Sequence, residues 1–192
     1  MSLADAVRLR AWPSVDARTL AVLQILVGSL LVAACAQIAI PLPWTPVPVT
    51  GQTLGVLLVG AALGARKGAA ALLLYLAEGA AGLPFFAGGT AGARVFLGPT
   101  GGYLVGFPLA AAVVGCLAER GWDRHVVTMV AAMSLGTTLL FATGCAWLGS
   151  FVGFDRVVAL GVLPFLPGAI LKIGVAAAAL PLAWRWVGRE SR

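Results

Sequence analysis

The sequence is poor in charged residues and in the side chains that usually perform catalysis. Only 10% of its 192 residues are charged, against 60% that are hydrophobic, and it contains a single histidine, His125. It has no glycine-rich phosphate-binding loop ending in Lys-Ser or Lys-Thr, and no His-Glu-x-x-His metal motif. If the protein moves a solute uphill, another polypeptide must therefore hydrolyse the ATP.

Cysteines are also few. Cys35, Cys116 and Cys145 are odd in number, lie inside apolar runs and show no paired spacing. The pattern supports neither a disulfide framework nor a metal site. We interpret the three residues as small hydrophobic side chains that pack between helices.

Apolar residues, in contrast, are abundant, and the mean hydropathy is +0.99. Soluble domains are roughly half apolar and about a quarter charged, so a soluble core cannot absorb this composition. Several apolar runs approach the ~20 residues that cross a bilayer. The sequence therefore predicts an all-α membrane protein with one membrane domain.

Prolines, glycines and charges divide the apolar sequence into six predicted transmembrane helices. Pro41 and Pro43 end the first, and the prolines that follow favour a stiff, extended loop. The second is long enough to span only if it begins near Val49. The approximate helix ranges are 20–41, 49–65, 68–83, 100–118, 126–149 and 164–185 within a domain of residues 20–186, flanked by cytoplasmic segments 1–19 and 187–192.

The basic residues predict the orientation, because cytoplasmic loops collect Lys and Arg. Ten fall on one side of the predicted spans: Arg8, Arg10, Arg18, Arg66, Lys67, Arg120, Arg124, Arg185, Arg189 and Arg192. Arg94 and Arg156 fall on the other side. Both termini are therefore predicted to be cytoplasmic, and the net charge of +6 is interpreted as a topology signal rather than a nucleic-acid-binding surface.

Two ionisable residues, Glu78 and Lys172, lie inside predicted spans. Such a side chain costs at least ~2.5–3.5 kcal/mol in lipid, so it should face the protein interior or a cavity and have a partner. Both lie in the outer half of their helices. Either they form a structural pair that joins two helices, or at least one of them contacts a bound polar solute.

The predicted outer loops combine aromatic residues with Gly, Pro and Thr rather than with charges. The aromatic residues are Trp44, Phe85, Phe86 and Tyr103. Irregular backbone at membrane depth needs protein or a water-filled cavity around it, so these loops are expected to cap a ligand pocket. The alternative for each aromatic residue is a place in the interfacial belt of the membrane.

The first predicted helix carries Ser29 and Ala33 at a spacing that lets two helices approach closely in lipid. The partner helix could belong to this protein or to another subunit.

Four ordered motifs between about residues 20 and 185 resemble the BioY family. They are Pro48-Val-Thr-Gly-Gln52-Thr, Tyr75-Leu-Ala-Glu78-Gly-Ala-Ala-Gly-Leu-Pro84-Phe-Phe-Ala-Gly-Gly89, Leu97-Gly-Pro-Thr-Gly-Gly-Tyr103-Leu-Val-Gly-Phe107 and Leu163-Pro-Phe-Leu-Pro-Gly168-Ala-Ile-Leu-Lys172. BioY proteins are the substrate-binding subunits of energy-coupling-factor (ECF) biotin transporters.

The resemblance implies a multi-pass subunit of the cell membrane that binds biotin with high affinity as its transported ligand, without a cofactor. Its implied partners are membrane lipid, a transmembrane coupling protein, which Ser29 and Ala33 would meet, and two ABC-type ATPase subunits. Whether copies of the chain also form a homo-oligomer is left open.

Biotin presents a carboxylate, a ureido ring and an apolar body, so a mostly apolar pocket with a few polar anchors would suit it. Candidate contacts are Lys172 and Arg94 for the carboxylate, Thr50, Gln52 and Glu78 for the ureido ring, and Trp44, Phe86 and Tyr103 for the apolar walls.

One position departs from the family pattern Pro-Gly-Asp-x-x-Lys. Here Ala169 stands at the Asp position, whereas Lys172 is retained. The Asp and Lys are expected to act together at the ligand, so either the ureido contact or the charge balance of the lysine is altered. Glu78 is the candidate substitute.

Two other functions compete with the importer. A secondary transporter or channel for another small vitamin-like solute should show internal repeats and paired broken helices, which are not evident. A membrane-embedded enzyme would need a nucleophile–base pair or a metal set, and Glu78 with Lys172 supplies neither.

Overall fold

The computed structural model describes residues 2–11 and 15–189, and within these ranges the chain is mainly helical, as the sequence predicts. The helices are α1 (Leu3–Ala11), α2 (Ala17–Ala36), α3 (Gln52–Leu63), α4 (Ala65–Ala80), α5 (Gly101–Glu119), α6 (Val126–Val152), α7 (Val157–Gly161) and α8 (Leu166–Arg189). Short 3-10 turns are η1 (Ala87–Gly89), η2 (Ala93–Leu97), η3 (Trp122–Arg124) and η4 (Leu163–Phe165).

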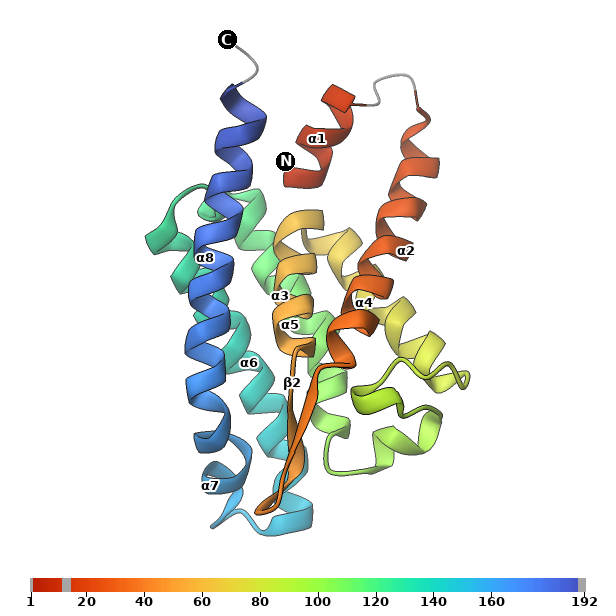
Figure 1. Cartoon of the computed structure of the whole chain (residues 1–192), viewed down its shortest axis with the longest axis vertical. Coiled ribbons are helices and arrows are strands. Elements are labelled where there is room, and N and C mark those ends of the chain that lie inside the picture. The colour runs from red at the N-terminus through yellow and green to blue at the C-terminus, as the bar shows by residue number, and fades with distance from the viewer. Residues whose placement is uncertain (1, 12–14, 190–192) are drawn as a thin grey trace.

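The long helices run alongside one another in a bundle (Figure 1). Helix α5 packs against α3, α4 and α6, and small residues bring these backbones together. A Cβ atom added to Gly60 of α3 would lie 2.6 Å from the carbonyl oxygen of Ala111, and one added to Gly115 would lie 2.5 Å from the backbone nitrogen of Ala65. Glycine at both positions therefore permits backbone contact, the usual way in which helices associate in lipid.

Four helical stretches are long and apolar enough to cross a membrane: α2, α5, α6 and residues 157–185, which include most of α8. The second and third predicted spans correspond to shorter helices. Helix α3 has 12 residues, or about 18 Å, and α4 has 16, or about 24 Å, against a hydrocarbon core of about 30 Å.

A two-stranded hairpin replaces the expected end of the first helix and the loop after it. Strands β1 (Ala39–Leu42) and β2 (Thr45–Thr50) are antiparallel, with Ala39 opposite Thr50 and Leu42 opposite Thr45. The first helix ends at Ala36 rather than near residue 41, because Pro41 disfavours helical backbone at the residue before it. Figure 1 shows β2 continuing in the direction of α3, so extended backbone adds the length that this helix lacks.

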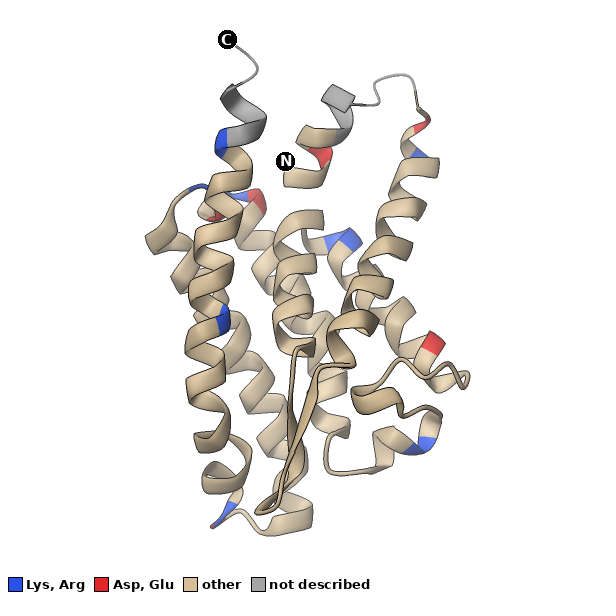
Figure 2. Ribbon diagram, viewed as in Figure 1, with Lys and Arg blue, Asp and Glu red and all other residues tan. Residues whose placement is uncertain are grey.

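Charged residues concentrate at the end of the bundle where α1 lies (Figure 2). The predicted N-terminal segment contains α1, and Lys67 of α4 bonds to this helix. The Nζ atom of Lys67 lies 2.6 Å from Oδ1 of Asp5 and donates to Oε1 of Gln24 at 2.8 Å. Lys172 stands apart from these charges as the seventh of the 24 residues of α8.

Candidate functional site

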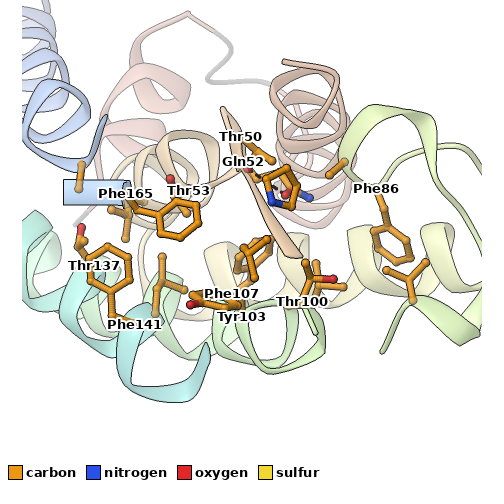
Figure 3. Close-up of a pocket in the computed structure, with 18 of the residues that line it drawn as sticks. Thr50, Gln52, Thr53, Phe86, Thr100, Tyr103, Phe107, Thr137, Phe141 and Phe165 are labelled. Atoms are coloured by element: carbon orange, nitrogen blue, oxygen red, sulfur yellow. Dashed lines mark hydrogen bonds between the residues drawn. The ribbon is translucent and has the colours of Figure 1, made fainter. Parts of the chain in front are cut away.

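A cavity of about 310 Å³ lies in the half of the bundle that contains the hairpin (Figure 3). Its walls come from β2, the start of α3, the loop between α4 and α5, α5, α6, η4 and the start of α8. Most of the lining is apolar, with a small number of polar side chains. This composition is typical of sites that bind small organic molecules.

Aromatic side chains form much of the apolar wall. Phe107 and Tyr103 come from α5, Phe141 from α6, Phe165 from η4 and Phe86 from the loop after α4. Figure 3 shows these rings distributed around the cavity. The wall is thus assembled from segments far apart in the sequence.

Phe86 closes one side of the cavity because α4 leaves room for its ring. The side chain is only 1% exposed, although it belongs to a loop. A Cβ atom added to Gly79 would overlap this ring. Glycine at position 79 therefore determines how deeply the loop can enter the bundle.

Lys172 supplies the positive charge of the cavity. Its Nζ atom donates to the backbone oxygen of Thr50 at 2.6 Å and to Oγ1 of Thr53 at 2.8 Å. Among the lining residues in the described part of the chain it is the sole charged one. An ammonium group has three donors, and here two of them meet neutral oxygens, so a bound anion could take the third.

Gln52 supplies an amide at the junction of β2 and α3. Its Oε1 accepts from the hydroxyl of Thr50 at 3.0 Å, and its Nε2 donates to the hydroxyl of Tyr75 at 2.6 Å. The side chain is buried yet lines the cavity. The junction of strand and helix therefore holds a hydrogen-bonding side chain in a fixed pose beside Lys172.

The structure brings together five of the residues that the sequence singles out for ligand binding. These are Thr50, Gln52, Phe86, Tyr103 and Lys172, and all of them line the cavity. The Tyr103 side chain is also held by a residue outside the cavity lining, because its hydroxyl donates to the backbone oxygen of Gly161 at 2.8 Å.

Three other candidates do not line this cavity. Trp44 lies at the hairpin turn and is 60% exposed, and Arg94 is exposed on η2. Glu78 is half-buried on α4, and its Oε2 is buried without a hydrogen-bond partner in the described chain. The rotation of α4 about its axis turns Tyr75 rather than Glu78 toward Gln52.

The structure does not contain the Glu78–Lys172 pair that one interpretation of the sequence predicts. Lys172 bonds to Thr50 and Thr53 instead, and within the described residues no ion pair joins it to Glu78. Ala169 lines the cavity one turn before Lys172, whereas Glu78 does not line it. Glu78 therefore does not stand at the place in the cavity where the acidic residue of the family pattern would lie.

Ser29 and Ala33 face the interior of the protein. They are 0% and 5% exposed, and the neighbouring Gly28 faces Ala71 of α4 so closely that an added Cβ would lie 3.0 Å from the Ala71 Cβ. Of the two alternatives for this small-residue face, the structure has the internal one. A side chain without accessible surface cannot contact another subunit in this conformation.

Several lining residues escape sequence reasoning, namely Thr53, Thr100, Phe107, Thr137, Phe141 and Phe165. A signal for some of them exists in their spacing. Thr137 and Phe141 are four residues apart on α6 and so share one helical face. Such spacing is common in apolar helices and does not by itself indicate a cavity.

The chain is similar to proteins of the BioY family along most of its length. The BioY family model matches residues 8–189. The biotin transporter BioY of Rhizobium etli is 40% identical over 164 residues, which cover 81% of this chain and 88% of that protein. The biotin transporter BioY of Rhodobacter capsulatus is 39% identical over 165 residues, covering 78% and 85%.

A solved structure has the same fold. The crystal structure of the S-component for biotin from an ECF-type ABC transporter matches with a TM-score of 0.77 at 21% identity, covering 88% of this chain and 92% of that one. Together with the four long apolar helices, these relationships identify an integral membrane protein. The family match spans nearly the whole chain, and the two relatives are 40% and 39% identical over the aligned residues, so the chain belongs to the BioY family.

Proposed function

We propose that this chain binds biotin from the outer side of the cell membrane and is the substrate-binding subunit of an ECF-type vitamin importer. The observation that carries the proposal is the mostly apolar cavity of about 310 Å³ with Lys172 as its charged residue. The relatives named biotin transporters supply the identity of the ligand. The volume lies at the lower end of the roughly 300–1,000 Å³ range of small-molecule sites.

The lining matches the chemistry of biotin part by part. Lys172 offers a donor to the carboxylate, and the Thr50–Gln52 pair offers hydrogen-bonding groups to the ureido ring. Phe86 and Tyr103 provide apolar surface for the thiophane ring and the valeryl chain. In this assignment Lys172, rather than the exposed Arg94, is the anchor of the carboxylate.

We further propose six membrane crossings, made by α2, α3, α4, α5, α6 and α8, with both termini in the cytoplasm. The concentration of Lys and Arg at one end of the bundle supports this orientation. The six residues of β2 add about 20 Å to α3, which brings this segment to the thickness of a bilayer. The cavity then lies in the outer half of the membrane.

The partners of the proposed importer are a transmembrane coupling protein and two ABC-type ATPase subunits. The chain has no phosphate-binding loop, so the ATP that drives uptake in this proposal is hydrolysed by the other subunits. The outward face of α2 carries exposed apolar residues, Val22, Leu23, Val27 and Leu30, which can meet lipid or the coupling protein.

The experiment that tests the ligand is equilibrium binding of the purified protein to a panel of labelled vitamins in detergent. We expect tight binding of biotin and no comparable binding of vitamins without a ureido ring. Tight binding of another vitamin in the absence of biotin binding would contradict the proposed function. Uptake by this chain in cells without ATPase partners would contradict the proposed energy source and favour a secondary transporter.

A further inference from the structure

Tyr75 lies behind the cavity and touches the residues that form its wall. It belongs to α4 and is 0% exposed. Its ring packs edge-on against Phe86, with centroids 5.7 Å apart, and is stacked on Phe107 at 6.4 Å. Both phenylalanines line the cavity, whereas Tyr75 does not. Any ligand effect of Tyr75 must therefore act through its neighbours.

The hydroxyl of Tyr75 has one hydrogen, and the structure determines where it goes. The hydroxyl lies 3.1 Å from the backbone oxygen of Phe85, which can only accept a hydrogen bond. Tyr75 therefore donates this hydrogen to the backbone oxygen of Phe85. In its contact with Gln52 the hydroxyl must then be the acceptor. Gln52 accordingly presents its Nε2 to Tyr75, at 2.6 Å.

This arrangement fixes the orientation of the Gln52 amide. With Nε2 held by Tyr75, Oε1 lies on the opposite side, where it accepts from the hydroxyl of Thr50 at 3.0 Å. An amide oxygen has two acceptor positions, and the Thr50 hydroxyl uses one. The remaining position is available to a ligand, because Gln52 and Thr50 both line the cavity and lie close together in it (Figure 3).

We propose that Tyr75 is a positioning residue that holds Gln52 with its carbonyl oxygen available to the ligand, and that this makes the cavity select ligands with an N–H donor. The inference rests on the proposed function, since the ureido group of biotin supplies such a donor. Without the Tyr75 hydroxyl the amide can turn over and present its NH₂ group instead. The turned amide offers a ligand N–H no acceptor, so selection is lost.

The first test is a double-mutant cycle on biotin binding by the full-length protein. Tyr75→Phe removes the hydroxyl and keeps both ring contacts, and it should weaken biotin binding by at least about tenfold, or about 1.4 kcal/mol. In a Gln52→Leu protein there is no amide to orient. There the same substitution should change the affinity by no more than about twofold.

The second test uses the ligand and does not depend on the Gln52→Leu protein. The wild type should prefer biotin over its ureido-N-methylated analogue by at least about tenfold, and Tyr75→Phe should reduce this preference to about threefold or less. Tyr103→Phe is the matched control, since it removes the hydroxyl of the other tyrosine, which donates to Gly161 instead. Its effect on biotin affinity should be the same in the wild-type and Gln52→Leu backgrounds.

Three results would overturn the inference: unchanged affinity in Tyr75→Phe, a tenfold loss that persists in the Gln52→Leu background, or an undiminished preference for the unmethylated ligand. A merely structural role of Tyr75 would lower the thermal stability without altering that preference. Failure of the wild type to bind biotin would instead contradict the proposed function, so the two failures are distinguishable.

Discussion

The proposed cytoplasmic end of the bundle, which contains α1 and is called the inner end below, and the cavity each contain one of the two lysines of the chain. The two lysines are bonded in different ways. Lys67 at the inner end has a carboxylate partner, Asp5, at 2.6 Å. Among the described residues, the hydrogen-bond partners of Lys172 in the cavity are only neutral oxygens, those of Thr50 and Thr53. A lysine whose charge is already compensated holds helices together, whereas one without a counter-ion is prepared for an anionic ligand.

The two regions also differ in how closely their segments pack. At the inner end glycines bring helix backbones into contact, as Gly115 does against Ala65. Around the cavity, threonine and aromatic side chains from separate segments leave a space between them. The cavity is thus confined to the half that contains the hairpin, where these side chains hold the segments apart.

The largest expected effect comes from removing the cavity charge. Lys172→Met should weaken biotin binding by at least about tenfold, because the ligand carboxylate loses its cation in an apolar surrounding. Equilibrium binding in detergent measures this. Arg94→Ala is the comparison, since its side chain is exposed outside the cavity, and it should weaken binding less. Equal losses in the two variants would contradict the assignment of the anchor.

A smaller loss is expected from filling the space beneath Phe86. In Gly79→Ala the new methyl group displaces the ring and alters one wall of the cavity, so biotin affinity should fall by roughly threefold to tenfold, or about 0.7–1.4 kcal/mol. Gly174→Ala is the matched control. It makes the same change on α8, and no atom lies within 4 Å of the added Cβ there. It should bind biotin like the wild type, and a comparable loss there would show that the effect is not specific to Phe86.

At the inner end, Lys67→Met should lower thermal stability without changing biotin affinity. A pair of this kind contributes about 0.2–1 kcal/mol, which corresponds to a Tm decrease of roughly 0.4–4 °C. Loss of biotin binding in this variant, with the fold intact, would break the division between a structural and a binding lysine.

The same pair predicts a pH dependence. Burial alone would raise the pKa of Asp5, but hydrogen bonds from Lys67 and Ser2 outweigh it and hold the pKa below its ordinary value of 3.8. The contribution of the pair is therefore present above pH 3.8 and is lost as the pH falls through the folded pKa. The Tm difference between wild type and Lys67→Met should disappear over that acidic range.

A stability effect of similar size and opposite sign is expected at Asp123, which is buried in η3. Burial raises its pKa above the ordinary value of 3.8, and the hydrogen bond donated by Trp184 offsets only part of this. Stability is then lost as the pH rises through the folded pKa, because a buried carboxyl must ionise. Asp123→Asn should raise the Tm at neutral pH by about 2–4 °C, and a lower Tm would contradict this account.

The sequence indicates the long helices well, because their apolar runs end at charges, glycines or prolines. The run predicted over residues 100–118 corresponds to α5, Gly101–Glu119. The hairpin is harder to foresee. The prolines after Trp44 predict extended backbone, but the partner strand, Ala39–Leu42, is part of an apolar run that suits helix or strand equally.

The candidate site could be predicted only in part. Lys172 and Gln52 stand out because polar residues are rare in this sequence, and both line the cavity. Glu78 stands out equally but does not line the cavity. Its direction could not be predicted, because the sequence of a helix with apolar residues on all sides does not determine how that helix is rotated about its axis. Thr137 and Phe141 are hidden for the opposite reason, since they resemble ordinary lipid-facing or packing residues.

The central claim is that Lys172, whose charge no acidic residue of the cavity lining compensates, binds the carboxylate of biotin. The most direct test compares the affinity of biotin with that of its primary carboxamide in the wild type and in Lys172→Met. We expect the wild type to prefer the carboxylate by at least about tenfold and the variant to prefer it by no more than about twofold. Equal affinity of the wild type for both ligands, or a preference that survives in Lys172→Met, would contradict the claim.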